Sequence, residues 1–380
     1  MKLIHLSDLH LGKRLHEFPF LEDQAYILDN ILEIIIDEMP DAALIAGDVY
    51  DKSSPSAEAV SLFDDFLVSL AATGTKVFVI GGNHDSPERL SFGGRLMAPS
   101  GVFLAPAYSG IARAVALEDG FGSVNIFMLP FVKTANVRAA FPEDSAGFAS
   151  HTDAIRRAVA EMGIDPGARN VLVAHQFITD AVTCDSEEAS LGGSDNVDAS
   201  VFDGFDYVAL GHLHGPQYIE KESIRYCGSP LKYSFSECEH EKSLTVVELG
   251  RKGDVRIDTR PLSPRRDMRE IKGAYDELMN RANYINTDTD DYLHITLTDE
   301  ETIPYAINRL RIVYPNVMRL DYENTRTKRQ GGMDGDYCIK NITPLEALAE
   351  LFERQSGKAM SAQQEKYAAG LVGEIWGDEK

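Results

Sequence analysis

Five short polar segments, each directly after an apolar run, contain the residues best suited to chemistry in this chain. Seven of their side chains are of types that bind metal ions: Asp8, His10, Asp48, Asn83, His175, His212 and His214. The apolar runs are short and rich in β-branched residues, which predicts buried strands. Each polar segment is therefore expected at the carboxyl end of a strand, where ligands bind in open α/β sheets. One such ending is ordinary turn chemistry, but five predict a shared site.

The types of the candidate ligands limit which metal ions could bind and which reaction those ions could support. Carboxylate, imidazole and amide groups without a thiolate suit Mn²⁺, Fe or Zn²⁺. Seven candidates are more than one ion needs, so a two-metal site with one bridging carboxylate is the economical arrangement. Two neighbouring ions activate water and stabilise phosphoryl oxygens during an in-line displacement. The pattern therefore predicts hydrolysis of a phosphate ester.

The stretch GGNHD, residues 81–85, adds a further function to this set. His84 lies between Asn83 and Asp85, so it is expected to face substrate. A histidine there can stabilise transition-state charge or protonate a leaving oxygen, and Asp85 is expected to orient it. The glycines allow the backbone to approach ions and phosphate closely.

Composition limits the remaining possibilities. The 380 residues are 44% hydrophobic and 26% charged, which predicts a globular protein of two or three domains. No apolar run is long enough to span a bilayer, and the four cysteines form no C-x-x-C pair. We expect a cytoplasmic protein with free thiols. A net charge of −23 argues against a protein that binds DNA through an overall positive potential. Either nucleic acid is not the substrate, or bound cations, local basic patches or a partner supply the positive charge.

Strand and helix patterns alternate in the first half of the chain, which predicts a layered α/β domain with two sheets. Helical spacing appears over residues 22–39, 57–72 and 152–162. Residues 261–267 contain two prolines and two arginines and predict a boundary. Beyond it we expect a small α/β domain, with helices over 275–282 and 303–314, then a flexible linker and two amphipathic helices. The predicted parts are residues 1–262, 267–324, 325–342 and 343–376.

The ordered set D-x-H, G-D-x-x-D, G-N-H-D, H and G-H-x-H resembles the calcineurin-like metallophosphoesterases. Within them, five stretches resemble the SbcD nuclease subunits of DNA double-strand-break repair. They are LSDLHLG (6–12), AGDVYD (46–51), GGNHDSPERLSFG (81–93), GHLHGPQ (211–217) and YCGSP (226–230).

This resemblance implies an αββα metallophosphoesterase domain, a small α/β capping domain that positions DNA, and a C-terminal helical hairpin. It assigns one metal ion to Asp8, His10, Asp48 and His214. It assigns the other ion to Asp48, Asn83, His175 and His212, with Asp48 bridging. His84 would be the catalytic histidine. The ions would be two Mn²⁺, with Mg²⁺, Fe or Zn²⁺ as alternatives.

The resemblance also implies a substrate and partners. The family cuts DNA as an exonuclease and endonuclease, acts on double-stranded ends, single strands and hairpins, and functions in repair, recombination and replication. It works as a dimer with the SbcC ATPase, on whose coiled-coil base the last two helices would dock. Two other hypotheses stay open. The chain could be a small-molecule phosphodiesterase or phosphomonoesterase, or it could be a metal-bearing scaffold without catalytic activity.

Some polar residues have no assigned role at this stage. Asp51 is one of them, and Lys13 and Arg14 fit either a phosphate contact or solvated surface. A larger basic group fits either a DNA-facing patch or a soluble linker: Arg265, Arg266, Arg326, Lys328 and Arg329.

Overall fold

The computed structural model describes residues 1–380 except 145–146, 188–195, 326, 328–342, 357 and 377–380. The chain divides into two compact units, Met1–Met268 and Arg269–Lys380. The first unit contains every candidate metal ligand.

The first sheet of this unit has six strands in the order β14-β13-β1-β4-β5-β6. In that order they are Val255–Pro261, Ser243–Leu249, Lys2–Leu6, Ala42–Ala46, Lys76–Ile80 and Val102–Leu104. The strands β1, β4, β5 and β6 are parallel neighbours, so their carboxyl ends lie at the same edge. Every residue of β4 is buried, as expected for a central strand covered on both faces.

The second sheet also has six strands, in the order β11-β12-β10-β9-β8-β7. In that order they are Gln217–Ile219, Lys221–Tyr226, Tyr207–Gly211, Arg169–His175, Gly122–Leu129 and Val115–Asp119. The four strands from β12 to β8 are parallel, and the strands at both edges pair antiparallel. The central strands β9 and β10 are buried along their whole length.

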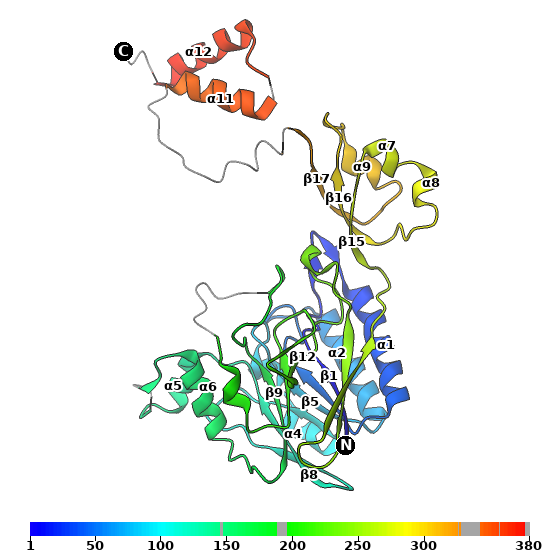
Figure 1. The fold of residues 1–380 in the computed structure, drawn as a ribbon, viewed down its shortest axis with the longest axis vertical. Coiled ribbons are helices and arrows are strands. Elements are labelled where there is room, and N and C mark those ends of the chain that lie inside the picture. The colour runs from blue at the N-terminus through cyan, green and yellow to red at the C-terminus, as the bar shows by residue number, and fades with distance from the viewer. Residues whose placement is uncertain (145–146, 188–195, 326, 328–342, 357, 377–380) are drawn as a thin grey trace. The chain divides into compact units, whose positions relative to one another are not determined.

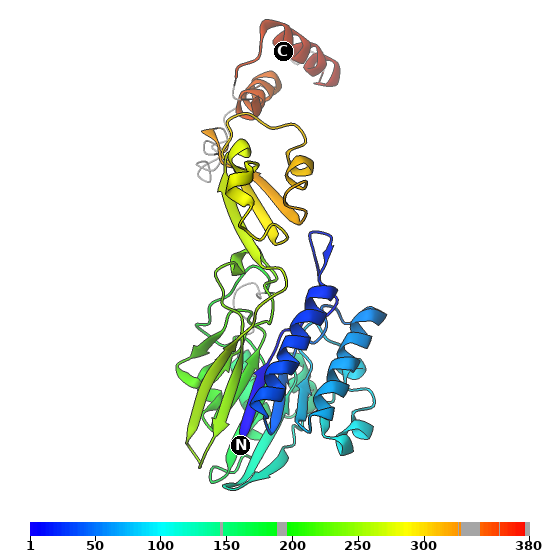
Figure 2. The same ribbon diagram turned by 90° about the vertical axis from the view of Figure 1, so that its right-hand side faces the viewer.

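The two sheets pack face to face between helices, which confirms the predicted layered α/β fold. Leu44 and Phe78 of the first sheet share one core with Val173 and Tyr207 of the second. The helices that cover the outer faces are α1 (Leu21–Glu38), α2 (Ala57–Ala72), α5 (Thr134–Ala140) and α6 (His151–Ala160). The pairs α1–α2 and α5–α6 lie on opposite sides of the strands (Figure 1). The view in Figure 2 shows α1 and α2 side by side.

Local signals place the first two helices where the sequence predicts them. The helix α1 ends at Glu38 because Met39 adopts φ 48°, a left-handed conformation, directly before Pro40. The amino end of α2 is capped by the Ser56 hydroxyl, which accepts a hydrogen bond from the Ala59 amide. These helices connect β1 to β4 and β4 to β5, and so bring the three strands together in parallel.

A buried histidine joins the two sheets just below the predicted site. The Nε2 atom of His5 lies 3.1 Å from the Leu210 carbonyl, which can only accept, so Nε2 carries the proton. Its Nδ1 atom then accepts from the Tyr207 hydroxyl at 2.9 Å. Burial lowers the pKa of His5 to about 3, so the ring is neutral near pH 7. This contact links β1 to β10 before either strand reaches its polar ending.

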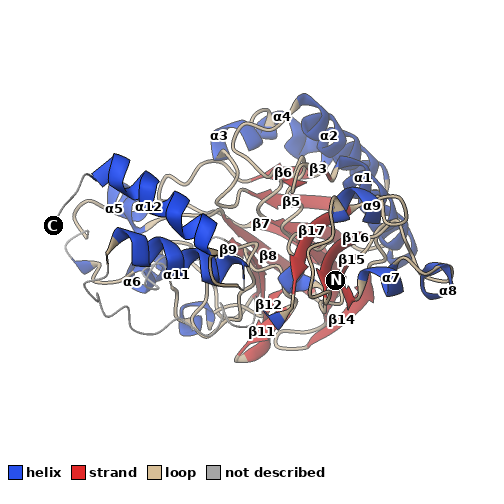
Figure 3. Cartoon of the chain, turned by 90° about the horizontal axis from the view of Figure 1, so that it is seen from above, coloured by secondary structure: helices blue, strands red, loops and turns tan. Residues whose placement is uncertain are grey.

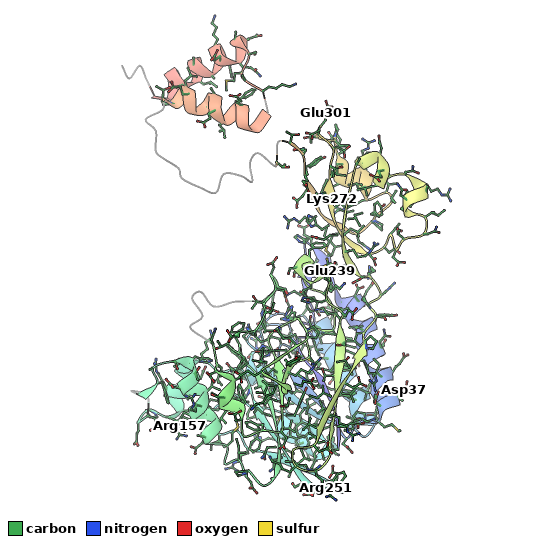
Figure 4. The ribbon with its side chains drawn as sticks, viewed as in Figure 1. Asp37, Arg157, Glu239, Arg251, Lys272 and Glu301 are labelled. Carbon is green, nitrogen blue, oxygen red and sulfur yellow. The ribbon has the colours of Figure 1, made fainter. Side chains whose placement is uncertain are left out.

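The remaining short elements lie in the loops of the first unit. They are β2 (Arg14–Leu15), β3 (Phe18–Pro19), α3 (Pro87–Leu90), α4 (Gly94–Met97), and the 3₁₀ turns η1 (Ala98–Ser100), η3 (Ala199–Phe202) and η4 (Phe235–Glu237). Figure 3 shows the strands of the unit between its helices. Charged side chains such as Asp37 and Arg251 are exposed on this unit (Figure 4).

The second unit has a three-stranded sheet in the order β15-β16-β17 and several helices. Its elements are β15 (Met268–Gly273), α7 (Tyr275–Leu278), α8 (Arg281–Tyr284), β16 (Tyr292–Leu297), α9 (Ala306–Leu310), β17 (Val317–Tyr322), α11 (Pro344–Ser356) and α12 (Ala362–Trp376). Leu293, Ile295 and Leu310 belong to its core. The predicted linker, residues 325–342, lies almost entirely outside the described residues.

Two helices of this unit are shorter than the sequence pattern predicts. The helix expected over 303–314 spans only Ala306–Leu310, because Tyr305 at its amino end adopts φ 56°. The helix expected over 275–282 is interrupted at Asn280, whose extended backbone and side chain instead cap α8. Among the described residues, no helix has the length and apolar character needed to cross a membrane.

Candidate metal centre

The five predicted strand endings meet at one edge of the first unit. Neighbouring endings are joined through their backbones: the Asp8 amide donates to the Gly47 carbonyl at 3.0 Å, and the His10 amide donates to the Asp48 carbonyl at 2.9 Å. The two sheets are joined there by the His212 amide, which donates to the Asp8 carboxylate at 3.1 Å. Residues separated by about half of the chain thus form one cluster.

Asp48 lies between the two predicted groups of ligands. Its Oδ2 atom is 3.7 Å from His10 Nε2 on one side and 3.4 Å from His175 Nε2 on the other. Its Oδ1 atom accepts a hydrogen bond from the His84 amide at 2.9 Å. One carboxylate oxygen therefore faces both groups, which is the geometry that a bridging ligand needs.

The first group contains Asp8, His10 and His214, whose ligand atoms lie within 4.8 Å of one another. The Nε2 atoms of His10 and His214 are 3.1 Å apart, and both rings are buried. The other nitrogen of His10, Nδ1, is buried and makes no hydrogen bond among the described residues. The Nε2 atom, which faces His214 and Asp48, is therefore the ring nitrogen of His10 available to a cation in this group.

The second group converges on the amide oxygen of Asn83. This oxygen lies 3.0 Å from His175 Nε2 and 3.0 Å from His212 Nδ1. The ligand atoms of His175, Asp48 and Asp8 also lie within 4.8 Å of one another. The two groups supply the oxygen and nitrogen donors that borderline divalent ions prefer, so the residues fit two cations.

Four of the ligand residues have strained backbones. Asp8, His10, Asp48 and His212 have φ angles of 54°, 44°, 49° and 106°. Such angles are uncommon for residues with a side chain and cost on the order of 1–3 kcal/mol each. The strain turns each side chain toward the cluster at the point where its strand ends.

Glycines allow the strand ends to approach this closely. A Cβ atom on Gly211 would lie 1.9 Å from the Ala46 carbonyl oxygen and 2.8 Å from His175 Nδ1. One on Gly82 would lie 2.1 Å from Asp48 Oδ1. Both distances are far below contact distance, so larger residues would force the two sheets or the ligands apart.

Gly211→Ala is therefore expected to lower the free energy of unfolding by at least about 1–3 kcal/mol, as overpacking does, and to weaken cation binding. Gly120→Ala is the matched control, since a Cβ atom at Gly120 meets nothing within 4 Å. Urea unfolding of the metal-free proteins measures the difference. Equal stability of the two variants would contradict the close approach at Gly211.

Electrostatics divide the cluster into neutral and charged groups. Burial lowers the pKa of His212 to about 3 and that of His10 well below its usual value, so both are neutral, the form that binds metals. Burial opposes charge on His175 as well, but the Asp48 carboxylate outweighs it and raises the His175 pKa to about 9. Burial raises the pKa of Asp8 to about 6. The Asp48 carboxylate thus favours the charged form of His175, whereas burial keeps His10 and His212 neutral.

Comparison with known families identifies the fold. A family model described as calcineurin-like phosphoesterase matches residues 1–216. The chain belongs to this family. It is a metal-dependent hydrolase, and the family together with the cluster of histidines and aspartates indicates two metal ions. A second model, SbcD_C, described as the type 5 capsule protein repressor C-terminal domain, matches residues 264–356, in agreement with the resemblance to SbcD subunits.

Two solved structures are similar to this phosphoesterase at low identity. A dimetal phosphatase from Danio rerio is 10% identical, with 69% of this chain and 96% of that chain covered, at a TM-score of 0.44. The phosphoesterase Yfce from E. coli is 13% identical, with 69% and 100% covered, at a TM-score of 0.28.

The predicted catalytic pair of this phosphoesterase is arranged differently from the sequence-based expectation. The Asp85 carboxylate accepts hydrogen bonds from the amides of Val49, Tyr50 and Gly82 at 2.9–3.0 Å. It therefore ties the loop after β4 to the turn after β5. The side chain of His84 is positioned by the carbonyl of Asp51, 3.0 Å from Nδ1. Asp85 supports the shape of the loop, and Asp51, which had no assigned role, orients the histidine.

Several residues that hold the site have no clear sequence signal. The Gln24 amide group donates to the His10 carbonyl at 2.7 Å, and its oxygen accepts from the Gly12 amide at 2.9 Å. Gln24 could have been noticed as a polar residue near the apolar stripe of a helix. Four others come from loops and had no such signal: Ser186, Glu187, Glu237 and Lys242.

The basic residues that had no assigned role differ in their interaction partners. The Lys13 ammonium pairs with the Asp51 carboxylate at 2.9 Å, next to the cluster. Arg266 pairs with the buried Asp23 at 2.8 Å, which favours a structural role. Arg14 donates to the Glu17 carbonyl, and Arg265 lies 3.4 Å from Glu22. Arg326, Lys328 and Arg329 lie outside the described residues.

Proposed function

We propose that the chain is a Mn²⁺-dependent DNA nuclease that hydrolyses phosphodiester bonds at DNA ends and hairpins, as the SbcD-type subunit of a complex with an SbcC-type ATPase. The observation that carries the proposal is the match of residues 264–356 to the SbcD_C model, in the same chain as a phosphoesterase site. A phosphoesterase of small molecules has no evident need for this additional unit.

In this proposal the two ligand groups hold one cation each. Asp8, His10 and His214 hold the first ion and Asn83, His175 and His212 hold the second, with Asp48 shared. When bound, two such ions activate water and stabilise phosphoryl oxygens. The enclosed, neutral histidines and the strained backbone keep these donors in place before substrate arrives.

His84 is the group best placed to contact substrate. Its side chain is 19% exposed, whereas those of His10, Asp48, His175 and His214 are 0–3% exposed. The Asp51 carbonyl accepts from Nδ1, so Nε2 is the nitrogen that exchanges a proton. From there His84 can stabilise charge on a phosphoryl oxygen or protonate the leaving oxygen.

The C-terminal helices are proposed to bind the ATPase partner, and the nuclease is proposed to act as a homodimer in the cytoplasm. Leu351 of α11 is 53% exposed and Tyr367 of α12 is 70% exposed. Exposed apolar side chains on two contacting helices are what a docking hairpin requires.

The test is cleavage of a labelled DNA hairpin with a single-stranded tail by the purified chain in Mn²⁺. Asp8→Ala is the control for a contaminating nuclease. Cleavage by the wild type alone supports the proposal. If the wild type, alone and with its ATPase and ATP, leaves DNA intact but hydrolyses bis-p-nitrophenyl phosphate, the substrate is a smaller phosphodiester.

A further inference from the structure

His214 is held by polar side chains from two separate loops. Ser186 Oγ lies 2.8 Å from its Nδ1 atom, and the Glu187 carboxylate accepts from its amide at 2.5 Å. Lys242 donates to its carbonyl at 2.9 Å. These contacts restrain the ring, the amide and the carbonyl of one residue together.

Behind Ser186 lies a buried carboxylate that the proposed chemistry does not use. Glu237 is fully buried and accepts hydrogen bonds from Ser186 Oγ at 2.6 Å and from the Tyr233 amide at 3.1 Å. It also pairs with Lys242 at 2.5 Å. Both of its oxygens therefore accept: one from Ser186 and the Tyr233 amide, the other from the Lys242 ammonium, which is the arrangement of an ionised carboxylate.

The charge on Glu237 determines which nitrogen of His214 carries the proton. An ionised carboxylate only accepts, so the Ser186 hydroxyl must donate to Glu237. The same hydroxyl then accepts from Nδ1–H of His214. This leaves Nε2 of His214 without a proton, at the position where it faces His10.

The second ligand group has no equivalent support among the described residues. His175 Nδ1 lies 2.8 Å from the Ala46 carbonyl, a neutral partner. A carboxylate behind a ligating histidine raises the basicity of that ligand, and its loss costs about 10- to 100-fold in metal affinity. The two groups therefore differ in the charge placed behind their histidines.

We propose that Glu237, acting through Ser186, is a positioning residue that fixes the tautomer of His214 and makes the cation site of Asp8, His10 and His214 the tighter of the two. The inference rests on the proposed two-metal site. Glu237 lies far from the ligand motifs in the sequence. In this inference it makes one of two otherwise similar metal-binding steps tighter than the other.

Calorimetric titration of the metal-free chain with Mn²⁺ tests this inference, with equilibrium dialysis to count bound ions. Wild type should bind two ions in two steps. Glu237→Gln should weaken the tighter step by about 10- to 100-fold and leave the other unchanged. Asp206→Asn is the matched control, because Asp206 is also a buried carboxylate that pairs with a lysine, Lys252, and accepts from a backbone amide. It should bind both ions as wild type does.

Ser186→Ala provides an independent test that leaves the Glu237–Lys242 pair intact. It should weaken the same step, and ¹⁵N spectra of histidine-labelled, metal-free protein should show that His214 no longer holds its proton on Nδ1 alone. Wild-type affinities in Ser186→Ala, or equal weakening of both steps in Glu237→Gln, would overturn the inference. Fewer than two ions bound by wild type would instead overturn the two-metal function.

Discussion

Replacing Asp48 with alanine is expected to abolish hydrolysis and to disrupt both cation sites at once. Asp48 Oδ2 lies 3.7 Å from His10 Nε2 and 3.4 Å from His175 Nε2, so one oxygen serves both ligand groups. The loss should exceed the roughly 10- to 100-fold cost of removing an outer partner of a ligand. Mn²⁺ titration and phosphodiester hydrolysis by the same preparations measure the two effects.

The matched control for Asp48→Ala is Asp37→Ala, the same change at an exposed position on α1. It should bind two ions and retain wild-type turnover. Circular dichroism of Asp48→Ala shows whether the fold persists. A folded Asp48→Ala protein that still binds two ions would contradict a shared carboxylate and would require two separate sites.

Replacing His84 with glutamine should lower turnover by about 10²- to 10⁴-fold, the usual contribution of a general acid or base, while both ions stay bound. We expect turnover and not metal binding to change because the His84 side chain is 19% exposed, unlike the buried ligands, and its ring is held by the Asp51 carbonyl. Rates with saturating Mn²⁺ and metal titrations of the same protein separate catalysis from binding.

His175→Gln supplies the contrast for His84→Gln, because His175 is fully buried and contacts both Asp48 and Asn83. It should lose one ion as well as activity. His84 Nε2 lies 4.0 Å from Asp48 Oδ2, so a direct role in metal binding is the rival explanation. Loss of an ion in His84→Gln would support that rival and remove His84 from the catalytic role.

Much of the first unit follows from local sequence patterns. The runs before Asp8, Asp48 and Asn83 form buried strands where their composition predicts them. Both long helices lie within one residue of their predicted bounds. Because the carboxyl ends of parallel strands meet at one edge, the predicted endings come together once the two sheets pack.

Other features depend on contacts that no local pattern reports. The sequence suggests that Asp85 orients His84, since the two are adjacent. In the structure Asp85 binds three backbone amides, and a carbonyl from another loop orients the histidine. Ser186 and Glu237 lie 51 residues apart, and neither belongs to a ligand motif. The short α9 likewise depends on the left-handed backbone at Tyr305.

The kind of chemistry can therefore be predicted from the residues alone, because ligand types and strand endings are local properties of the chain. How the ligands are shared between the two groups, and which residues support them, depends on the packing of the two sheets. Asp48 lies between two histidines from different sheets, and Glu237 reaches His214 through a serine of a separate loop. These contacts form only when the two sheets pack together, because the packing brings residues far apart in the chain within hydrogen-bonding distance. Polar groups that become buried there need hydrogen-bond partners, and they obtain them from one another.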